Sequence, residues 1–353
     1  MSTESGGLGG NEIRADSSPR CIACNGEGRV VHSEQRDRLF GAWGGWDLKQ
    51  CNNGKCGLVW LDPMPLKRDI GKAYKGYYTH LTGVKTSILN PVKRIYESIR
   101  LGYLGRKYHY PLGHLPILGR TAAGLLYLFP GRRGSIDESV RFLTAKPGGR
   151  LLDVGCGSGE WLASMCNLGW MAEGVEFDKE AAGIARQKGL TVGDGSIEDQ
   201  AYPGESFDAI TLNHVIEHVP DPAVTLAECA RLLKPDGSLV VLTPNIASFG
   251  YRIFKENWRG LEPPRHLHVM SPASIHVLLV KAGFAKTRVS TRNSGYMLHQ
   301  SLMLWAGRVA DHGCMRSGVI SRCGAGLMTM MEGLLLKFNP GIGECIVTMS
   351  ERN

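Results

Sequence analysis

The sequence lacks any uninterrupted apolar run of about 18 residues, which is the length that a membrane-spanning helix needs. It also lacks an apolar stretch within residues 1–20, which are polar and rich in glycine and serine. These absences argue against an integral membrane protein and against a secretory signal peptide. We therefore expect a cytoplasmic protein whose residues 1–20 form a disordered tail.

The composition is that of an ordinary globular protein, but its charge is uneven. Hydrophobic residues make up 43% and charged residues 21% of the 353 residues, which suits one large domain or two unequal ones. Between positions 65 and 146, 15 Lys or Arg residues accompany only 4 Asp or Glu residues. This basic segment could face an acidic substrate, nucleic acid or anionic lipid, or it could simply be a solvated surface.

From residue 149 to about residue 284, short apolar runs alternate with amphipathic helical patterns. Strands are predicted at 150–154, 171–176, 207–212 and 238–242, and helices at 160–168, 179–188 and 223–233. This alternation is typical of βαβ units and a parallel sheet. The predicted parts are a disordered tail (1–20), a cysteine module (21–62), a basic helical linker or cap (63–147) and an α/β domain (148–353).

The most informative segment is LLDVGCGSG at residues 151–159. A predicted strand runs there into a turn in which Gly155 and Gly157 allow the backbone to approach a ligand closely. The turn lacks the third glycine position of the dinucleotide-binding fingerprint. Asp153 would repel a pyrophosphate but suits a cationic amino-acid ligand. Glu176 ends the next strand, where it can accept hydrogen bonds from ribose hydroxyls.

Five segments resemble, in order and spacing, the motifs of class I S-adenosylmethionine-dependent methyltransferases. They are LLDVGCGSG, GVEFD, GSIEDQAYPGESFD, LNHVIEHVPDP and LLKPDGSLVVLTPN. The sequence is most similar to the ubiquinone-biosynthesis type and to its relatives in bacterial polysaccharide gene clusters, and the likeness is strong over residues 149–284. The resemblance implies a Rossmann-like sheet with helices on both faces and S-adenosylmethionine as the cofactor.

The resemblance also assigns cofactor contacts to the loops that follow four successive strands. The residues so assigned are Asp153, Gly155, Gly157, Glu176, Ser196, Ile197, Asn213 and His214. The first three would line the methionine part, Glu176 would hold the ribose, the next two would flank the adenine, and the last two would close the pocket near the sulfonium. Ser196 departs from the pattern, because many relatives carry an Asp there.

Four of the ten cysteines form two short pairs, and the other six are expected to be buried thiols. The pairs are Cys21 with Cys24 and Cys51 with Cys56, at spacings that can close a tetrahedral zinc site. Many sugar-cluster methyltransferases resemble this arrangement, although the second pair is wider here. We expect a structural zinc, since four thiolates leave no open position. Free thiols or a redox pair are the alternative.

Two histidine-bearing segments compete for a catalytic role, residues 214–218 and residues 262–268. We prefer His266 as the general base, with Arg265 beside it able to bind a carboxylate or phosphate. The alternative is that these side chains only anchor or cap their loops. Related quinone O-methyltransferases use acidic and histidine groups of the first segment with a divalent cation. Because His214 stands where they carry an acid, we predict no such metal.

The resemblance implies methyl transfer to a small-molecule acceptor, which we expect to be a sugar, a nucleotide sugar or a lipid-linked glycan. A quinone or other phenol is the alternative. The methionine-rich stretch 297–336 is expected to pack in the core, although it could line an apolar pocket or rest on a membrane as a peripheral contact. Nucleic acid is a less favoured partner, because the sequence offers no aromatic-basic RNA motif.

Overall fold

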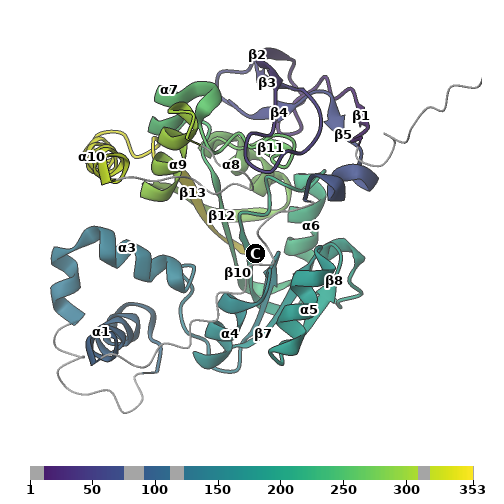
Figure 1. Cartoon of the computed structure of the whole chain (residues 1–353). Helices are drawn as coiled ribbons and strands as arrows, with labels where there is room; N and C mark the ends of the chain where they lie inside the picture. Colours follow the sequence, from purple (N-terminus) through teal and green to yellow (C-terminus); the bar gives the residue numbers. More distant parts are fainter. Residues whose placement is uncertain (1–11, 75–90, 112–122, 309–318, 353) are drawn as a thin grey trace, which may run out of the picture. The chain divides into compact units, whose positions relative to one another are not determined.

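The computed structural model describes residues 12–74, 91–111, 123–308 and 319–352. By compactness the chain divides into two units (Figure 1). The first unit consists of Met1–Tyr78, Asn213–Ala227 and Val241–Ser350. The second unit consists of Thr79–Leu212, Glu228–Val240 and Glu351–Asn353. Strand β10 (Leu233–Pro244) contributes residues to both units.

The second unit contains the predicted βαβ alternation. Its strands are β6 (Arg150–Val154), β7 (Met171–Glu176), β8 (Val192–Asp194) and β9 (Phe207–Asn213). Strand β6 pairs in parallel with β7 and β9, and β7 pairs in parallel with β8. Helices α4 (Glu160–Asn167) and α5 (Lys179–Gln187) connect these strands. The strand order of the whole sheet is β12-β13-β10-β9-β6-β7-β8, so the predicted α/β fold is confirmed.

Local chemistry explains why these elements form where the sequence predicted them. Every residue of β9 except the last is buried, as expected for a strand covered on both faces. Helix α5 starts at an Asp178 cap, whose carboxylate accepts hydrogen bonds from the N–H groups of Glu180 and Ala181. Strand β10 starts five residues earlier than predicted, ahead of turn-forming residues at 235–237.

A helical segment precedes β6 in the second unit. It contains α1 (Pro91–Tyr108), η3 (Ala123–Leu128) and α3 (Pro130–Ser139). The buried carboxylate of Asp137 on α3 accepts hydrogen bonds from the hydroxyls of Tyr103 at 2.8 Å and Tyr108 at 3.1 Å. Lys107 adds an ion pair of 2.8 Å to the same oxygen. These bonds attach α3 to α1, so this part of the basic segment is a helical layer.

The first unit contains the cysteine module and its small sheets. Its early strands are β1 (Ala15–Asp16), β2 (Gly28–Gln35), β3 (Trp46–Cys51), β4 (Val59–Leu61) and β5 (Met64–Pro65). Strand β1 pairs with β5, Ile13 is buried, and Arg14 forms an ion pair of 2.7 Å with Asp69. The predicted disorder is therefore wrong for residues 12–20, while residues 1–11 lie outside the described residues.

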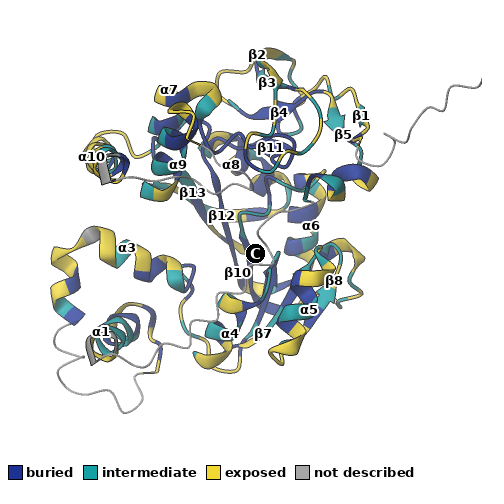
Figure 2. Cartoon of the chain, viewed as in Figure 1, coloured by how far each residue is buried: buried dark blue, intermediate teal, exposed yellow. Residues whose placement is uncertain are grey.

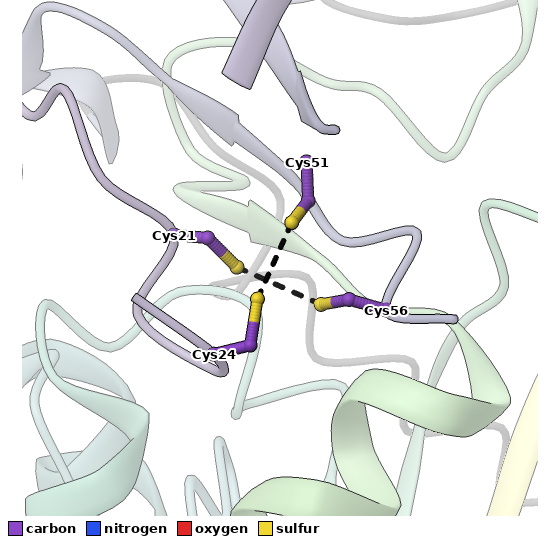
Figure 3. Close-up of side chains that lie close together, drawn as sticks. All are labelled: Cys21, Cys24, Cys51 and Cys56. Carbon is purple, nitrogen blue, oxygen red and sulfur yellow. Dashed lines mark hydrogen bonds between the residues drawn. The ribbon is translucent and has the colours of Figure 1, made fainter. Parts of the chain in front are cut away.

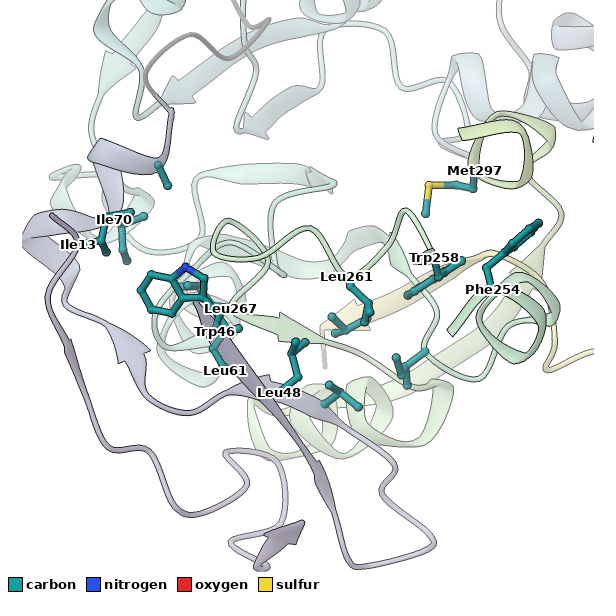
Figure 4. Packing of buried hydrophobic residues seen from close by; sticks show 14 of the residues in the cluster. Ile13, Trp46, Leu48, Leu61, Ile70, Phe254, Trp258, Leu261, Leu267 and Met297 are labelled. Atoms are coloured by element: carbon teal, nitrogen blue, oxygen red, sulfur yellow. The ribbon is translucent and has the colours of Figure 1, made fainter. Parts of the chain in front are cut away.

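The cysteine module shares a sheet and a core with the chain that follows β10. The sheet order is β11-β4-β3-β2, in which β11 (His268–Val269) pairs with β4. Figure 4 shows Trp46, Leu48 and Leu61 of the module in one apolar cluster with Trp258, Leu261 and Leu267. The module is therefore built into the first unit.

The rest of the first unit follows the expected order of strand, helical region and strand. Its elements are α6 (Pro222–Leu232, shared with the second unit), α7 (Phe249–Phe254), η5 (Lys255–Asn257), α8 (Pro272–Lys281), β12 (Phe284–Arg292), α9 (Gly295–Trp305), α10 (Val319–Leu335) and β13 (Cys345–Arg352). No helix of the described residues is long and apolar enough to cross a membrane.

The buried carboxyl group of Glu332 attaches α10 to the backbone just before β13. Oε1 of Glu332 accepts a hydrogen bond from the N–H of Glu344 at 2.9 Å. Its Oε2 is buried and has no hydrogen-bond partner among the described residues. Burial raises the pKa of Glu332 to about 8, and the nearby Glu344 carboxylate adds to this shift. Glu332 is therefore protonated in the folded protein at neutral pH.

The substitution Glu332→Gln should flatten the pH dependence of stability. Between pH 4.5 and pH 8 the folded protein keeps a proton on Glu332 that the unfolded chain releases, so its free energy of unfolding falls as the pH rises. We compare the free energy of unfolding of the variant with that of the parent protein at each pH. This difference should shift in favour of the variant by about 3–5 kcal/mol between pH 4.5 and pH 9. Urea titrations at both pH values measure this. The exposed Glu160→Gln serves as the control, and equal pH dependence of parent and Glu332→Gln would contradict a neutral Glu332.

Candidate functional site

The turn after β6 contains three glycines with positive φ. These angles are 70° at Gly155, 56° at Gly157 and 78° at Gly159. A Cβ on Gly159 would lie 2.4 Å from Cδ1 of Leu190, whereas a Cβ on Gly157 would meet no described atom within 4 Å. Gly159 is therefore needed for close packing against the neighbouring segment. Gly157 instead borders open space, as a ligand-binding loop requires.

Glu176, the last residue of β7, is hydrogen-bonded to this turn. Its Oε2 accepts from the N–H of Gly157 at 2.7 Å, and its Oε1 accepts from the N–H of Asp178 at 2.9 Å. Burial raises the pKa of Glu176, and the two N–H donors oppose that shift. The structure thus brings Glu176 and Gly157 together, while the role of Glu176 as a ribose ligand stays a prediction.

Asp153 is fully buried in the second unit and is paired with a residue that the sequence analysis missed. Its Oδ1 accepts hydrogen bonds from Arg141 and, at 2.9 Å, from Thr211. Its Oδ2 has no hydrogen-bond partner within the described part of the chain. The Arg141 guanidinium lies 3.6 Å from the centroid of the Trp161 ring. Burial raises the pKa of Asp153 and the charge of Arg141 opposes this, so the guanidinium helps to keep the carboxylate ionised.

Ser196 and Ile197 lie after β8, at the start of η4 (Ile197–Asp199). The Ser196 hydroxyl donates to Oδ2 of Asp199 at 2.8 Å, so it is engaged in a local cap. The Ile197 side chain is buried. Ile197 therefore packs inside the protein, and the adenine contact stays a prediction.

Asn213 and His214 belong to the first unit. The N–H of His214 donates to the carbonyl of Leu242 at 2.9 Å, and its Nδ1 lies 3.2 Å from Oε1 of Glu217. His214 has a positive φ of 55°. Its place near a sulfonium is a prediction that these contacts do not test.

Glu217, His218 and His266 form a polar cluster inside the first unit. One ligating atom of each lies within 4.8 Å of the others, and Glu217 and His266 are buried. The two imidazole rings meet edge to face, with centroids 4.7 Å apart. Such a set can transfer protons or bind a divalent cation. The sequence analysis expected no metal in this segment, but this group could hold one.

Hydrogen bonds to carbonyl oxygens fix the tautomers of both histidines. Nδ1 of His266 lies 2.7 Å from the carbonyl oxygen of Gly260. Nδ1 of His218 lies 2.9 Å from the carbonyl oxygen of Arg265 and 3.0 Å from the hydroxyl of Tyr74. Because a carbonyl only accepts, each Nδ1 donates and each Nε2 keeps its lone pair. Burial lowers the pKa of both histidines, so both are neutral at pH 7.

The suggestion that Arg265 binds a substrate anion is wrong. Its side chain is fully buried, and its Nη atoms donate to both oxygens of Asp37 at 2.8 and 2.9 Å. Its Nε donates to Glu262 at 2.8 Å. Arg265 therefore anchors the loop that contains His266, which is the alternative that the sequence left open.

The four cysteines of the module converge (Figure 3). The Sγ atoms of Cys21 and Cys56 are 3.6 Å apart, and those of Cys24 and Cys51 are 3.4 Å apart. All four atoms lie within 4.8 Å of one another. A tetrahedral zinc with bonds of about 2.3 Å places its sulfur ligands about 3.8 Å apart, so the arrangement fits a zinc ion.

Two residues of the candidate site, Arg141 and Tyr74, could not have been found from the sequence patterns. Arg141 lies in the segment interpreted as a linker, and Tyr74 ends η1 (Lys67–Tyr74), far in sequence from His218. The only signal for Arg141 was that it pairs with no acidic residue close to it in sequence. Many surface residues have the same feature.

Comparisons with known proteins agree with the resemblance seen in the sequence. Residues 131–289 match the family model of a methyltransferase domain. A ubiquinone biosynthesis O-methyltransferase of Hahella chejuensis is 40% identical over 123 residues, which cover 33% of this chain and 50% of that protein. One from Burkholderia vietnamiensis is 33% identical over 151 residues, which cover 40% of this chain and 63% of that protein.

Solved structures are more distant. A SAM-dependent methyltransferase of Thermotoga maritima is 19% identical, with a TM-score of 0.45, and the match covers 80% of this chain and all of that chain. The chain spans between 50% and 63% of the length of the two curated relatives named above. What those relatives act on is therefore not transferred directly to this chain.

Proposed function

We propose that this chain, a class I S-adenosylmethionine-dependent methyltransferase with its methyltransferase domain at residues 131–289, transfers a methyl group to a small molecule. The observation that supports this most is the hydrogen bond of Glu176 to the open Gly157 turn. The acceptor that we favour is a sugar, a nucleotide sugar or a lipid-linked glycan, because of the likeness to methyltransferases of polysaccharide clusters.

When bound, S-adenosylmethionine would supply an electrophilic methyl group. Its proposed contacts follow the family motifs, with the glycine turn at the methionine part and Glu176 at the ribose. The full proposed set is Asp153, Gly155, Gly157, Glu176, Ser196, Ile197, Asn213 and His214. The space beside Gly157 supports the assignment.

We propose His266 as the general base. Its Nε2 would take the proton of an acceptor hydroxyl while its Nδ1–H stays on the Gly260 carbonyl. His218, edge to face with His266, would hold the ring in place, and Tyr74 in turn contacts His218. The cluster thus orients one neutral imidazole for one proton transfer.

Methylation of a quinone or other phenol is the second candidate. The names of the curated relatives favour it. The lowered pKa of His266, caused mainly by burial, also favours it, because a weak base serves an acidic phenol better than a sugar hydroxyl.

The cofactor proposal predicts a loss of affinity in Glu176→Gln. Removing the charge should weaken binding of S-adenosylhomocysteine by about tenfold or more, since a hydrogen bond to a charged group contributes about 1.5–3 kcal/mol. Isothermal titration measures this. Glu173→Gln on the same strand, where Glu173 pairs with Arg150, should leave affinity unchanged. No binding by the folded parent protein, or equal binding in Glu176→Gln, would refute the proposal.

The base proposal predicts slow turnover in His266→Ala. Transfer of a labelled methyl group to nucleotide sugars and to catechols identifies the acceptor class. With the active acceptor, kcat should fall by about 10²–10⁴-fold while S-adenosylhomocysteine still binds. The exposed His276→Ala on α8 is the control. Normal turnover in His266→Ala would exclude His266 as the base, and transfer only to catechols would select the second candidate.

We also propose that Cys21, Cys24, Cys51 and Cys56 hold a structural zinc ion. Elemental analysis should find about one zinc per chain, and chelation should lower the unfolding temperature, since metal binding stabilises the fold that forms the site. Cys56→Ser should lose the zinc, whereas the exposed Cys166→Ser should keep it. A stable, metal-free parent protein with four titratable thiols in the module would support the alternative of free thiols.

A further inference from the structure

The second unit exposes a run of large apolar side chains between α1 and α3. Leu125, Tyr127, Leu128 and Phe129 are 59%, 53%, 73% and 58% exposed. We call these four residues the η3 patch. In Figure 2 the ribbon of α3, which follows this segment in the chain, includes several exposed residues in yellow. Side chains of this size at neighbouring positions are costly to leave in water, so they indicate a binding surface.

Buried residues, a ring contact and a backbone hydrogen bond hold the η3 patch in a fixed conformation. Ala123 and Leu126 of the same segment are buried, and the Tyr127 ring lies 5.9 Å from the Tyr103 ring of α1. The N–H of Phe129 donates to the carbonyl of Leu126 at 3.0 Å, which continues the turn into α3. The apolar side chains thus project from a folded base.

Positive charge surrounds the η3 patch. Arg106 and Arg132 are exposed, and the Arg133 guanidinium lies 5.2 Å from the centroid of the Tyr127 ring. Residues 91–111 and 123–139 contain seven Lys or Arg and three Asp or Glu. Ion pairs join Glu97 to Arg100 and Asp137 to Lys107. The surroundings therefore keep a net positive charge.

Helix α10 in the first unit offers a comparison. Leu327, Met330 and Leu334 of α10 are also exposed, at helical spacing, and so is Phe338 just beyond the helix. Residues 319–338 include two basic residues, Arg322 and Lys337, and one acid, Glu332. For this methionine-rich region the sequence favoured packing in the core and left a membrane contact as an alternative, and charge now distinguishes the two surfaces. Because more positive charge surrounds the η3 patch, an anionic partner should bind there rather than at α10.

We infer that the η3 patch binds the surface of an anionic lipid bilayer. Leu128 and Phe129 would enter the boundary between headgroups and acyl chains, and Tyr127 would lie at the headgroup level. Arg106 and Arg132 would bind lipid phosphates. The net positive charge of residues 91–111 and 123–139 matches the negative surface of an anionic bilayer. The inference does not depend on the proposed methyl transfer.

Sedimentation of the full chain with vesicles tests this inference. The protein should bind vesicles of equal parts phosphatidylglycerol and phosphatidylcholine, and bind pure phosphatidylcholine much more weakly, with binding reduced by added salt. The double variant Leu128→Ser/Phe129→Ser should weaken binding about tenfold or more. Arg106→Glu/Arg132→Glu, which keeps the apolar side chains, should weaken it comparably.

The matched control is Met330→Ser/Leu334→Ser on α10, which removes equally exposed apolar side chains and should leave vesicle binding unchanged. Thermal unfolding checks that each variant is folded, and the arginine variant decides the test if the serine variant is not. The inference is overturned if the parent protein does not bind anionic vesicles, or if only the α10 variant loses binding. It is also overturned if patch variants change the oligomeric state, measured by light scattering, without changing vesicle binding.

Discussion

The placement of His266 depends on the buried guanidinium of the residue before it. Arg265 is surrounded by two carboxylates, Asp37 and Glu262, and by the carbonyl oxygen of Ala73. A buried charge is tolerated only where its partners are held in good geometry, and loss of one partner is strongly destabilising. The loop that contains the proposed base is therefore fixed by a residue 228 positions away in sequence.

This ion network connects the cysteine module to the loop that contains His266. Asp37 lies between the two cysteine pairs, and β11, which begins at His268, completes the module's sheet. Lys281 at the end of α8 also donates to the carbonyl oxygen of Ala23 at 2.7 Å. A zinc ion that orders the module would thereby order the loop that contains His266. In this proposal the module supports the acid–base group. Its zinc ion would be structural and would take no part in the proton transfer.

In the second unit, hydrogen bonds from neighbouring residues order the glycine turn and Asp153. The Glu176 carboxylate fixes the Gly157 N–H, and Arg141 with Thr211 fixes Asp153. Such preorganisation lowers the conformational entropy that binding would otherwise cost. It also has a consequence for Glu176, whose oxygens already accept two N–H groups. A ribose must therefore use the remaining lone pairs of a carboxylate that is already in place.

The sequence predicted those parts of the fold that depend on local pattern. Strands β6 and β7 match their predicted bounds, because an apolar run ending in glycine or an acid leaves little choice of boundary. Pairs distant in sequence were not predictable, such as Arg265 with Asp37, Arg141 with Asp153 and Tyr74 with His218. Each residue of these pairs alone resembles a solvated surface group. The order of residues 12–20 was missed for the same reason, since Arg14 becomes informative only once its partner Asp69 is known to be buried.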